Sequence, residues 1–112
     1  MEARLKSGLW VQALIRRCDR ATIGVAVVKR GDGDAGAILL KLSGRGEGCT
    51  VLAQARRPDG ALVWLRATGP AAVAEAEADA YIARQRSRDP DLWVIEIESG
   101  SPESVLDAPI VS

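Results

Sequence analysis

The sequence predicts an α+β domain: a mostly antiparallel sheet of about five strands with two helices, in the order α-β-β-β-β-α-β. Residues 7–20 and 71–88 carry apolar side chains at helical spacing. Five other segments have the length of strands and are rich in apolar and β-branched residues. Short turns containing Gly, Asp or Pro separate the first four of these segments, as in an antiparallel meander.

Length and composition predict one domain with one core. The chain has 112 residues, of which 47% are hydrophobic. We expect residues 1–100 to form the domain and the Ser- and Pro-rich residues 101–112 to form a loose C-terminal tail. Because the chain contains no Phe, the core is expected to bury all three tryptophans, Trp10, Trp64 and Trp93.

The first helix is predicted over residues 7–20, with Ser7 as a candidate cap. Its apolar stripe contains Trp10, Leu14 and Cys18. Arginines cluster in its last turn, where cations favour the negative end of a helix; they are Arg16, Arg17 and Arg20.

The first strand is predicted over residues 21–30, and its two faces are apolar through Val27 and Val28, which favours a central place in the sheet. The turn GDGDAG (31–36) then suggests a hairpin with the strand at residues 37–42. The turns SGRGEG (43–48) and RPDG (57–60) lead into strands at residues 49–57 and 61–67.

The second helix is predicted over residues 71–88 and ends before Pro90, since the residue before a proline disfavours the α conformation. Its acidic residues come early and its arginines late, as the helix dipole favours. The expected inward stripe is Val73, Ala76, Ala80, Tyr81 and Ala83.

The last strand, LWVIEIE (92–98), is apolar on both faces in its first half, which places it inside the sheet or beside the first strand. Its second half carries Glu96 and Glu98 on one face, about 6.6 Å apart by strand rise. Either the strand emerges from under a helix into water, or the two carboxylates act as an acid–base pair. The second interpretation would make the protein a minimal hydrolase.

A basic patch is the strongest candidate binding site in the sequence. The helix-end arginines, with Arg30 after the first strand and Arg45 in a Gly-rich turn, are candidate anion- or partner-binding residues: Arg16, Arg17, Arg20, Arg30 and Arg45. Such a patch would support RNA or nucleotide binding, although few aromatic residues are available to stack bases. The alternative is that the arginines only complement the helix end.

Several kinds of chemistry are disfavoured. The chain has no His and only two cysteines, Cys18 and Cys49, and GDGDAG lacks the twelfth-position acid of a calcium loop. We therefore expect no metal and no cofactor. With no signal-peptide pattern and no apolar run of about 18 residues, we expect a cytoplasmic protein that does not enter a membrane.

The charge is unevenly distributed along the chain. Residues 1–60 contain eleven basic and six acidic groups, whereas residues 61–112 contain four basic and nine acidic groups. The imbalance is too weak to indicate nucleic acid as a partner on its own. It fits a domain whose halves attract each other, or a dimer that pairs unlike surfaces.

Three stretches carry a resemblance to a known family: LKSGLWVQALIRRCDR (5–20), AVVKRGDGDAGAILLKL (26–42) and RDPDLWVIEIE (88–98). They resemble an uncharacterised family of short alphaproteobacterial proteins, the domain of unknown function numbered fourteen-ninety-one. The stretch EGCTVLAQARRPDG (47–60) departs from the family pattern. The resemblance implies a small cytoplasmic bacterial protein and implies no activity, so it transfers no catalytic residue.

Taken together, the observations predict a non-enzymatic binding or protein-interaction module. We expect its partner to be another protein or a second copy of the chain. RNA or nucleotide binding through the arginines, and hydrolysis through Glu96 and Glu98, remain as alternatives. An exposed apolar strip or an unpaired sheet edge would favour the interaction module.

Overall fold

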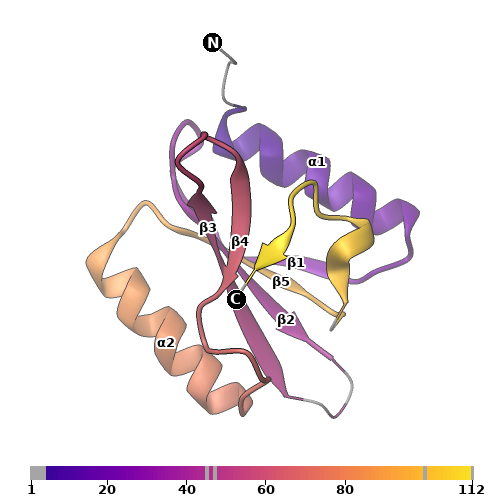
Figure 1. The fold of residues 1–112 in the computed structure, drawn as a ribbon, viewed down its shortest axis with the longest axis vertical. Helices are drawn as coiled ribbons and strands as arrows, with labels where there is room; N and C mark the ends of the chain where they lie inside the picture. The colour runs from indigo at the N-terminus through magenta and orange to yellow at the C-terminus, as the bar shows by residue number, and fades with distance from the viewer. Residues whose placement is uncertain (1–4, 45, 47, 100, 112) are drawn as a thin grey trace.

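The structure is a computed structural model that describes residues 5–44, 46, 48–99 and 101–111. Two helices and a six-stranded sheet make up the fold (Figure 1). In chain order the elements are α1 (Ser7–Arg20), β1 (Val25–Lys29), β2 (Ile38–Ser43), β3 (Cys49–Arg56), β4 (Leu62–Arg66), α2 (Glu75–Arg88), β5 (Trp93–Ile97), a 3₁₀ helix (Pro102–Ser104) and β6 (Ile110–Val111).

The sheet is mixed, with the strand order β1-β5-β2-β3-β4-β6. Neighbours pair antiparallel except β2 with β5 and β4 with β6, which pair parallel. The α+β class and the two helices are confirmed, and the sheet has one more strand than the five expected. The two helices lie on opposite faces of the sheet (Figure 1).

The predicted hairpin between the first two strands is wrong, because β5 lies between β1 and β2. The GDGDAG segment forms a connection whose groups bond to other parts of the chain. The Asp32 amide donates to the Asp91 carbonyl at 2.9 Å, and the Gly33 carbonyl accepts from the Gly8 amide at 2.9 Å. The segment therefore crosses the end of β5 and contacts the start of α1.

The position of β5 explains its apolar character on both faces. Trp93, Ile95 and Ile97 point into the core beneath α1, while Leu92 and Val94 point into the core beneath α2. A strand with a neighbour on each side and a helix over each face must be apolar on both faces. The expected division of its side chains between the two faces is confirmed.

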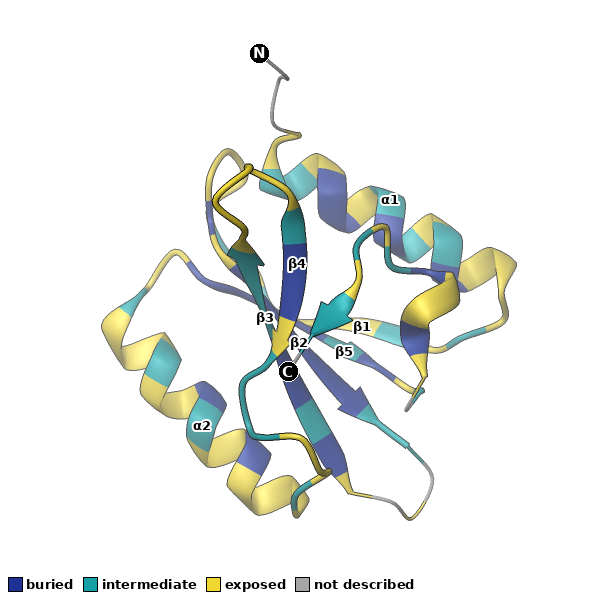
Figure 2. Cartoon of the chain, viewed as in Figure 1, coloured by how far each residue is buried: buried dark blue, intermediate teal, exposed yellow. Residues whose placement is uncertain are grey.

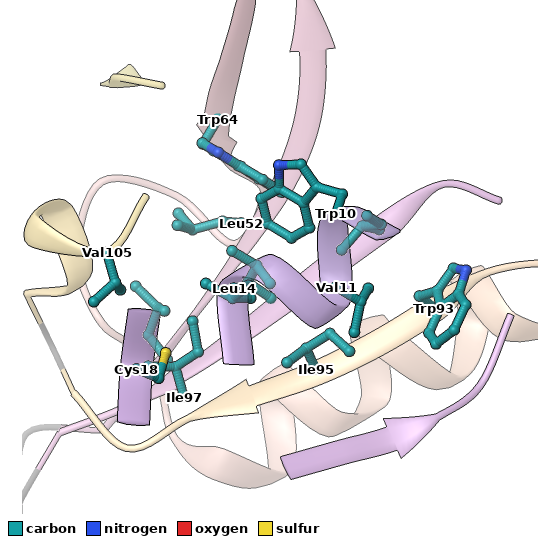
Figure 3. Close-up of a cluster of buried hydrophobic side chains, with 13 residues drawn as sticks. Trp10, Val11, Leu14, Cys18, Leu52, Trp64, Trp93, Ile95, Ile97 and Val105 are labelled. Atoms are coloured by element: carbon teal, nitrogen blue, oxygen red, sulfur yellow. The ribbon is translucent and has the colours of Figure 1, made fainter. Parts of the chain in front are cut away.

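The core beneath α1 contains the three tryptophans, all of them buried as predicted (Figure 3). The rings of Trp10 and Trp64 lie 5.4 Å apart at 46°, a tilted arrangement that aromatic pairs favour. Leu14 and Cys18 of α1 pack into the same core. The apolar stripe predicted for the first helix is therefore its buried face.

Helix α2 begins at Glu75, four residues after the predicted start. The preceding segment is extended, because Val73 exchanges two backbone hydrogen bonds with Cys49, of 2.7 and 2.8 Å. The later start moves the inward face to Ala78 and Ile82. Of the predicted inward stripe, Val73 and Tyr81 are half-buried, and the three alanines are exposed.

The predicted loose tail is wrong for the residues that the structure describes there. Pro102 and Val105 are buried, and Val105 joins the core beneath α1. The Trp64 amide donates to the Pro109 carbonyl at 2.9 Å, and β6 extends the sheet beside β4. The segment is ordered because its apolar residues cover the side of the core that Trp64 would otherwise expose to water.

Candidate interaction edge

Strand β1 forms one edge of the sheet, and among the described residues β5 is its only strand neighbour. The Gly24 carbonyl accepts a hydrogen bond from the Glu98 amide at 2.9 Å. Since inward and outward groups alternate along an antiparallel strand, Ala26 bonds toward β5, and the amides and carbonyls of Val25 and Val27 point outward. This edge thus offers a short row of backbone groups to an incoming strand.

The side chains of this edge are apolar and exposed. Val27 is 42% exposed and Val28 is 52% exposed, and Ala26, which precedes them, is also exposed. Figure 2 shows β1 largely in the colours of exposed and half-buried residues, in contrast to the dark blue of β2. The expectation that this strand lies in the centre of the sheet is wrong, although the strand forms and is apolar on both faces.

The edge lacks charged side chains over residues 25–28, although β1 is short and its register shifts between Val27 and Lys29. Charged side chains, especially Lys, commonly keep a sheet edge from pairing with another chain. Here residues 25–28 are uncharged. The one lysine, Lys29, turns its ammonium inward and donates to the carbonyls of Pro90 at 2.7 Å and Leu92 at 2.9 Å. Its ammonium therefore satisfies two carbonyls just before β5 and does not keep another strand from pairing with β1.

A groove of about 330 Å³ runs along the α2 side of this edge. Its walls combine apolar side chains from three elements with four charged ones: Val28, Ile82, Ala83, Val94, Lys41, Asp79, Arg86 and Glu96. The groove exists because α2 covers the middle of the sheet and leaves the α2-side face of β1 open. A side chain that enters from beyond β1 would meet this apolar wall first.

An ion cluster with a buried lysine at its centre lies beside the groove. Lys41, on β2, is 6% exposed, and its ammonium lies 2.8 Å from both Glu75 Oε2 and Asp79 Oδ1. Burial disfavours its charge, but hydrogen bonds to Asp79 and Glu75 and the charge of Glu96 outweigh burial and raise the pKa of Lys41. Lys41 is therefore a firmly protonated structural cation that is unsuited to act as a nucleophile or a base.

The two glutamates of the last strand have different surroundings. Glu96 is half-buried, lines the groove and accepts a hydrogen bond from Ser43 Oγ at 3.0 Å. Glu98 is exposed, and it is not among the described residues that line the groove. The expected emergence of this strand from beneath a helix fits the structure. The groove therefore holds one of the two carboxylates that a paired-carboxylate hydrolase would use.

The arginines of the predicted patch do not converge. Arg17 is half-buried, its Nε donates to the Val105 carbonyl at 2.6 Å, and its guanidinium lies 5.9 Å from the centre of the Trp10 ring. It therefore holds the C-terminal segment onto α1. Arg16 and Arg20, one turn apart, are exposed.

Arg30 lies at the other end of α1. The connection that follows it contacts Gly8 at the start of the helix, about 20 Å from Arg20 by helix rise. Its guanidinium lies 5.8 Å from the centre of the Trp93 ring. Arg45 falls outside the described residues. The described part of the patch reduces to Arg16 and Arg20.

The two cysteines lie on opposite sides of the sheet, and both are buried. Burial raises the pKa of Cys18 more than the nearby Arg17 lowers it, and burial also raises the pKa of Cys49 against the influence of Lys41. Both thiols are therefore held in the unreactive protonated form. Their role in the structure is to fill the core.

A wider cavity of about 1120 Å³ opens beside the start of α1, and three of its four charged side chains have local partners. Asp34 lies 3.6 Å from Lys6, Asp59 accepts from the Ala61 amide at 2.9 Å, and Arg56 donates to the Gly60 carbonyl at 2.6 Å. These groups stabilise their own turns and do not converge on a common point.

The described residues contain neither a cluster of metal-ligating side chains nor a membrane-spanning helix. In the ranges 5–44, 48–99 and 101–111, no three His, Cys, Asp or Glu side chains gather as a metal site would require. Neither helix in this part of the chain is long and apolar enough to cross a membrane.

The sequence and the fold match known proteins. The model of the family described as Protein of unknown function (DUF1491) matches residues 5–107. A crystal structure of a DUF1491 family protein from Caulobacter crescentus CB15 superimposes with a TM-score of 0.86 and 36% identity, covering 96% of this chain and 100% of that chain.

A solution structure of protein Atu0922 from A. tumefaciens gives a TM-score of 0.77 and 31% identity, covering 95% of both chains. A search of the curated proteins found no match. The extent of the family match, together with the agreement of whole folds at more than 30% identity, confirms the resemblance seen in the sequence. The chain belongs to the DUF1491 family.

Proposed function

We propose that the protein is a non-enzymatic interaction module that accepts an extended strand at the β1 edge. The observation that carries the proposal is the exposure of Val27 and Val28 on a strand whose outer backbone groups have no strand neighbour in the described part of the chain. Addition of a strand to an open edge is a common mode of peptide recognition, in which main-chain hydrogen bonds supply affinity and side-chain pockets supply specificity.

The edge defines the chemistry of the strand that it would accept. Apolar, β-branched side chains suit the exposed faces of Val27 and Val28, because such pairs stabilise adjacent strands. The Gly24 end of β1 lies beside Glu98, which is exposed. A cationic residue of the partner strand would be favoured at that end.

A peptide selection tests this function. Peptides of about ten residues, long enough to pair with the five residues of β1 and extend beyond both its ends, would be selected from a displayed random library and titrated into ¹⁵N-labelled protein. We expect the largest amide shifts at residues 25–28. We also expect Val28→Lys to abolish binding, and the control Leu9→Lys, which alters an equally exposed residue on α1, to leave it unchanged. Shifts centred on any other element would contradict the proposal.

A further inference from the structure

We infer that the strand accepted by β1 is the β1 strand of a second copy of the chain, paired antiparallel across a two-fold axis at Ala26. This inference rests on the proposed function and names its partner. The pair would join two sheets of this order into one continuous sheet through their β1 edges. Three features of the edge favour a copy of the chain over an unrelated strand.

The first feature is the match between backbone groups. Val25 and Val27 both direct their amide and carbonyl outward, and Ala26 lies midway between them. In an antiparallel pair centred on Ala26, Val25 of each copy faces Val27 of the other as a hydrogen-bonded pair. The same register leaves Ala26 opposite its own equivalent, where the two strands approach most closely and a small side chain fits.

The second feature is the side-chain composition of β1. Val25 already packs against the core beneath α1, and Val27 points to the same face but is exposed. In the proposed pair Val27 would lie beside Val25 of the other copy and extend that core across the axis. The side chains of β1 are thus apolar and mostly β-branched, which is the kind of side chain that pairs well with this edge.

The third feature is the charge polarity of the edge. Glu98 lies beside the Gly24 end, whereas Arg30 follows the Lys29 end and Arg86 lines the same groove as Val28. Antiparallel pairing brings the basic end of one copy toward the acidic end of the other. Parallel pairing would bring like ends together, which is unfavourable. The edge is therefore complementary to itself in one orientation.

The size of the contact predicts a reversible dimer. β1 has five residues, so strand pairing alone contributes less area than a standard stable interface. Sedimentation of the wild type from about 5 µM to about 1 mM should show a shift from the 11.9 kDa monomer to a dimer. Val27→Lys should weaken association at least about tenfold, because it places charge at the centre of the contact. Leu9→Lys should not.

A cysteine at the axis gives a positive test that does not depend on a damaging variant. In the proposed pair the two Ala26 Cα atoms would lie about 4.5 Å apart, within the range that a disulfide spans. Under mild oxidation Ala26→Cys should form a covalent dimer, and the control Ala61→Cys, on an exposed turn, should not. The native cysteines are buried and do not compete.

The outcomes separate the two proposals. A wild type that stays monomeric at about 1 mM, with equal cross-linking of Ala26→Cys and Ala61→Cys, would overturn self-pairing. In that case, selected peptides that still map to residues 25–28 would leave the strand-accepting function intact. A concentration-dependent dimer that survives Val27→Lys would also overturn the inference, since it would show that the copies associate through another surface.

Discussion

Val27 and Ile95 lie opposite each other in adjacent strands, yet Ile95 is fully buried and Val27 is 42% exposed. Both side chains point to the α1 side of the sheet. The difference arises because β5 has a strand on each side, whereas β1 has, within the residues that the structure describes, a strand on its inner side only. An apolar strand suited to the middle of a sheet thus forms its edge, and the exposed valines are the basis of the proposed function.

Lys41 should contribute stability through the packing of its side chain as well as through its charge. Lys41→Ala should lower the free energy of unfolding by about 1–3 kcal/mol, since it removes hydrogen bonds and packing but leaves Glu75 and Asp79 in contact with water. Lys41→Met, which keeps most of the volume, should change it by less than about 1.5 kcal/mol. Urea unfolding of both variants measures the difference. Equal losses in the two would contradict a role for packing.

The same lysine predicts a dependence on pH. Its pKa is raised in the folded state above the ordinary value of 10.5, so the folded protein holds this proton more tightly than the unfolded chain. The contribution should be complete below pH 10.5 and should be lost as the pH rises toward the folded pKa. The difference in unfolding free energy between wild type and Lys41→Met should therefore be constant from pH 7 to pH 9 and shift against the wild type above pH 10.5. A constant difference up to pH 11.5 would be inconsistent with a raised pKa.

Arg17 and Arg16 should behave differently despite their adjacency. Arg17→Ala removes the hydrogen bond to the Val105 carbonyl and the contact with Trp10, and it should cost about 1–3 kcal/mol and speed proteolysis after Gly100. Arg16→Ala, at an exposed position, should change stability by less than about 0.5 kcal/mol. Thermal unfolding and limited proteolysis of the pair test this. Equal behaviour would show that Arg17 does not hold the C-terminal segment.

The fold could be predicted from local pattern where burial depends on immediate neighbours. The apolar stripe of α1, the division of side chains along β5 and the burial of the tryptophans all follow from spacing and composition. The place of β1 in the sheet could not be predicted from its sequence. An apolar pattern favours a buried position, but it does not show which element would bury the strand. The insertion of β5 between β1 and β2 could not be predicted either, because GDGDAG is equally compatible with a tight turn and with a longer connection.

The candidate site shows the same limit. Arg17 looked like a member of a basic patch because helical spacing does not reveal which side chain meets a distant carbonyl. Lys41 is the one charged residue within AILLKL, and this position alone is only a weak indication of a buried ion pair. A charged residue inside an otherwise buried strand requires a partner, which α2 supplies through Glu75 and Asp79.

The C-terminal segment should be part of the folded core. Removal of residues 101–112 takes away the buried Pro102 and Val105 and the partner of the Trp64 amide, and it should cost about 3 kcal/mol or more. The full chain should show blue-shifted fluorescence that iodide quenches poorly, and the shortened chain should show a red shift. Identical spectra and melting curves for the two chains would be evidence of a dispensable tail.

Both cysteines should be unreactive in the native protein. Burial raises the pKa of Cys18 and of Cys49, so few thiolates are present at neutral pH, and reagents have little access to either sulfur. A thiol-specific reagent at pH 8 should react slowly with the native chain and rapidly with both thiols in denaturant. Immediate labelling of one thiol in the native protein would show that its side of the core opens readily.

Hydrogen exchange at the amides of Val25, Ala26 and Val27 is the most direct test of the open edge. The Ala26 amide faces β5 and should be protected at any protein concentration, whereas the amides of Val25 and Val27 point outward. We predict that Val25 and Val27 exchange rapidly in dilute protein and become protected as the concentration rises, while Ala26 changes little. Rapid exchange of Val25 and Val27 at every concentration, and in the presence of selected peptides, would contradict the central claim that β1 accepts a strand.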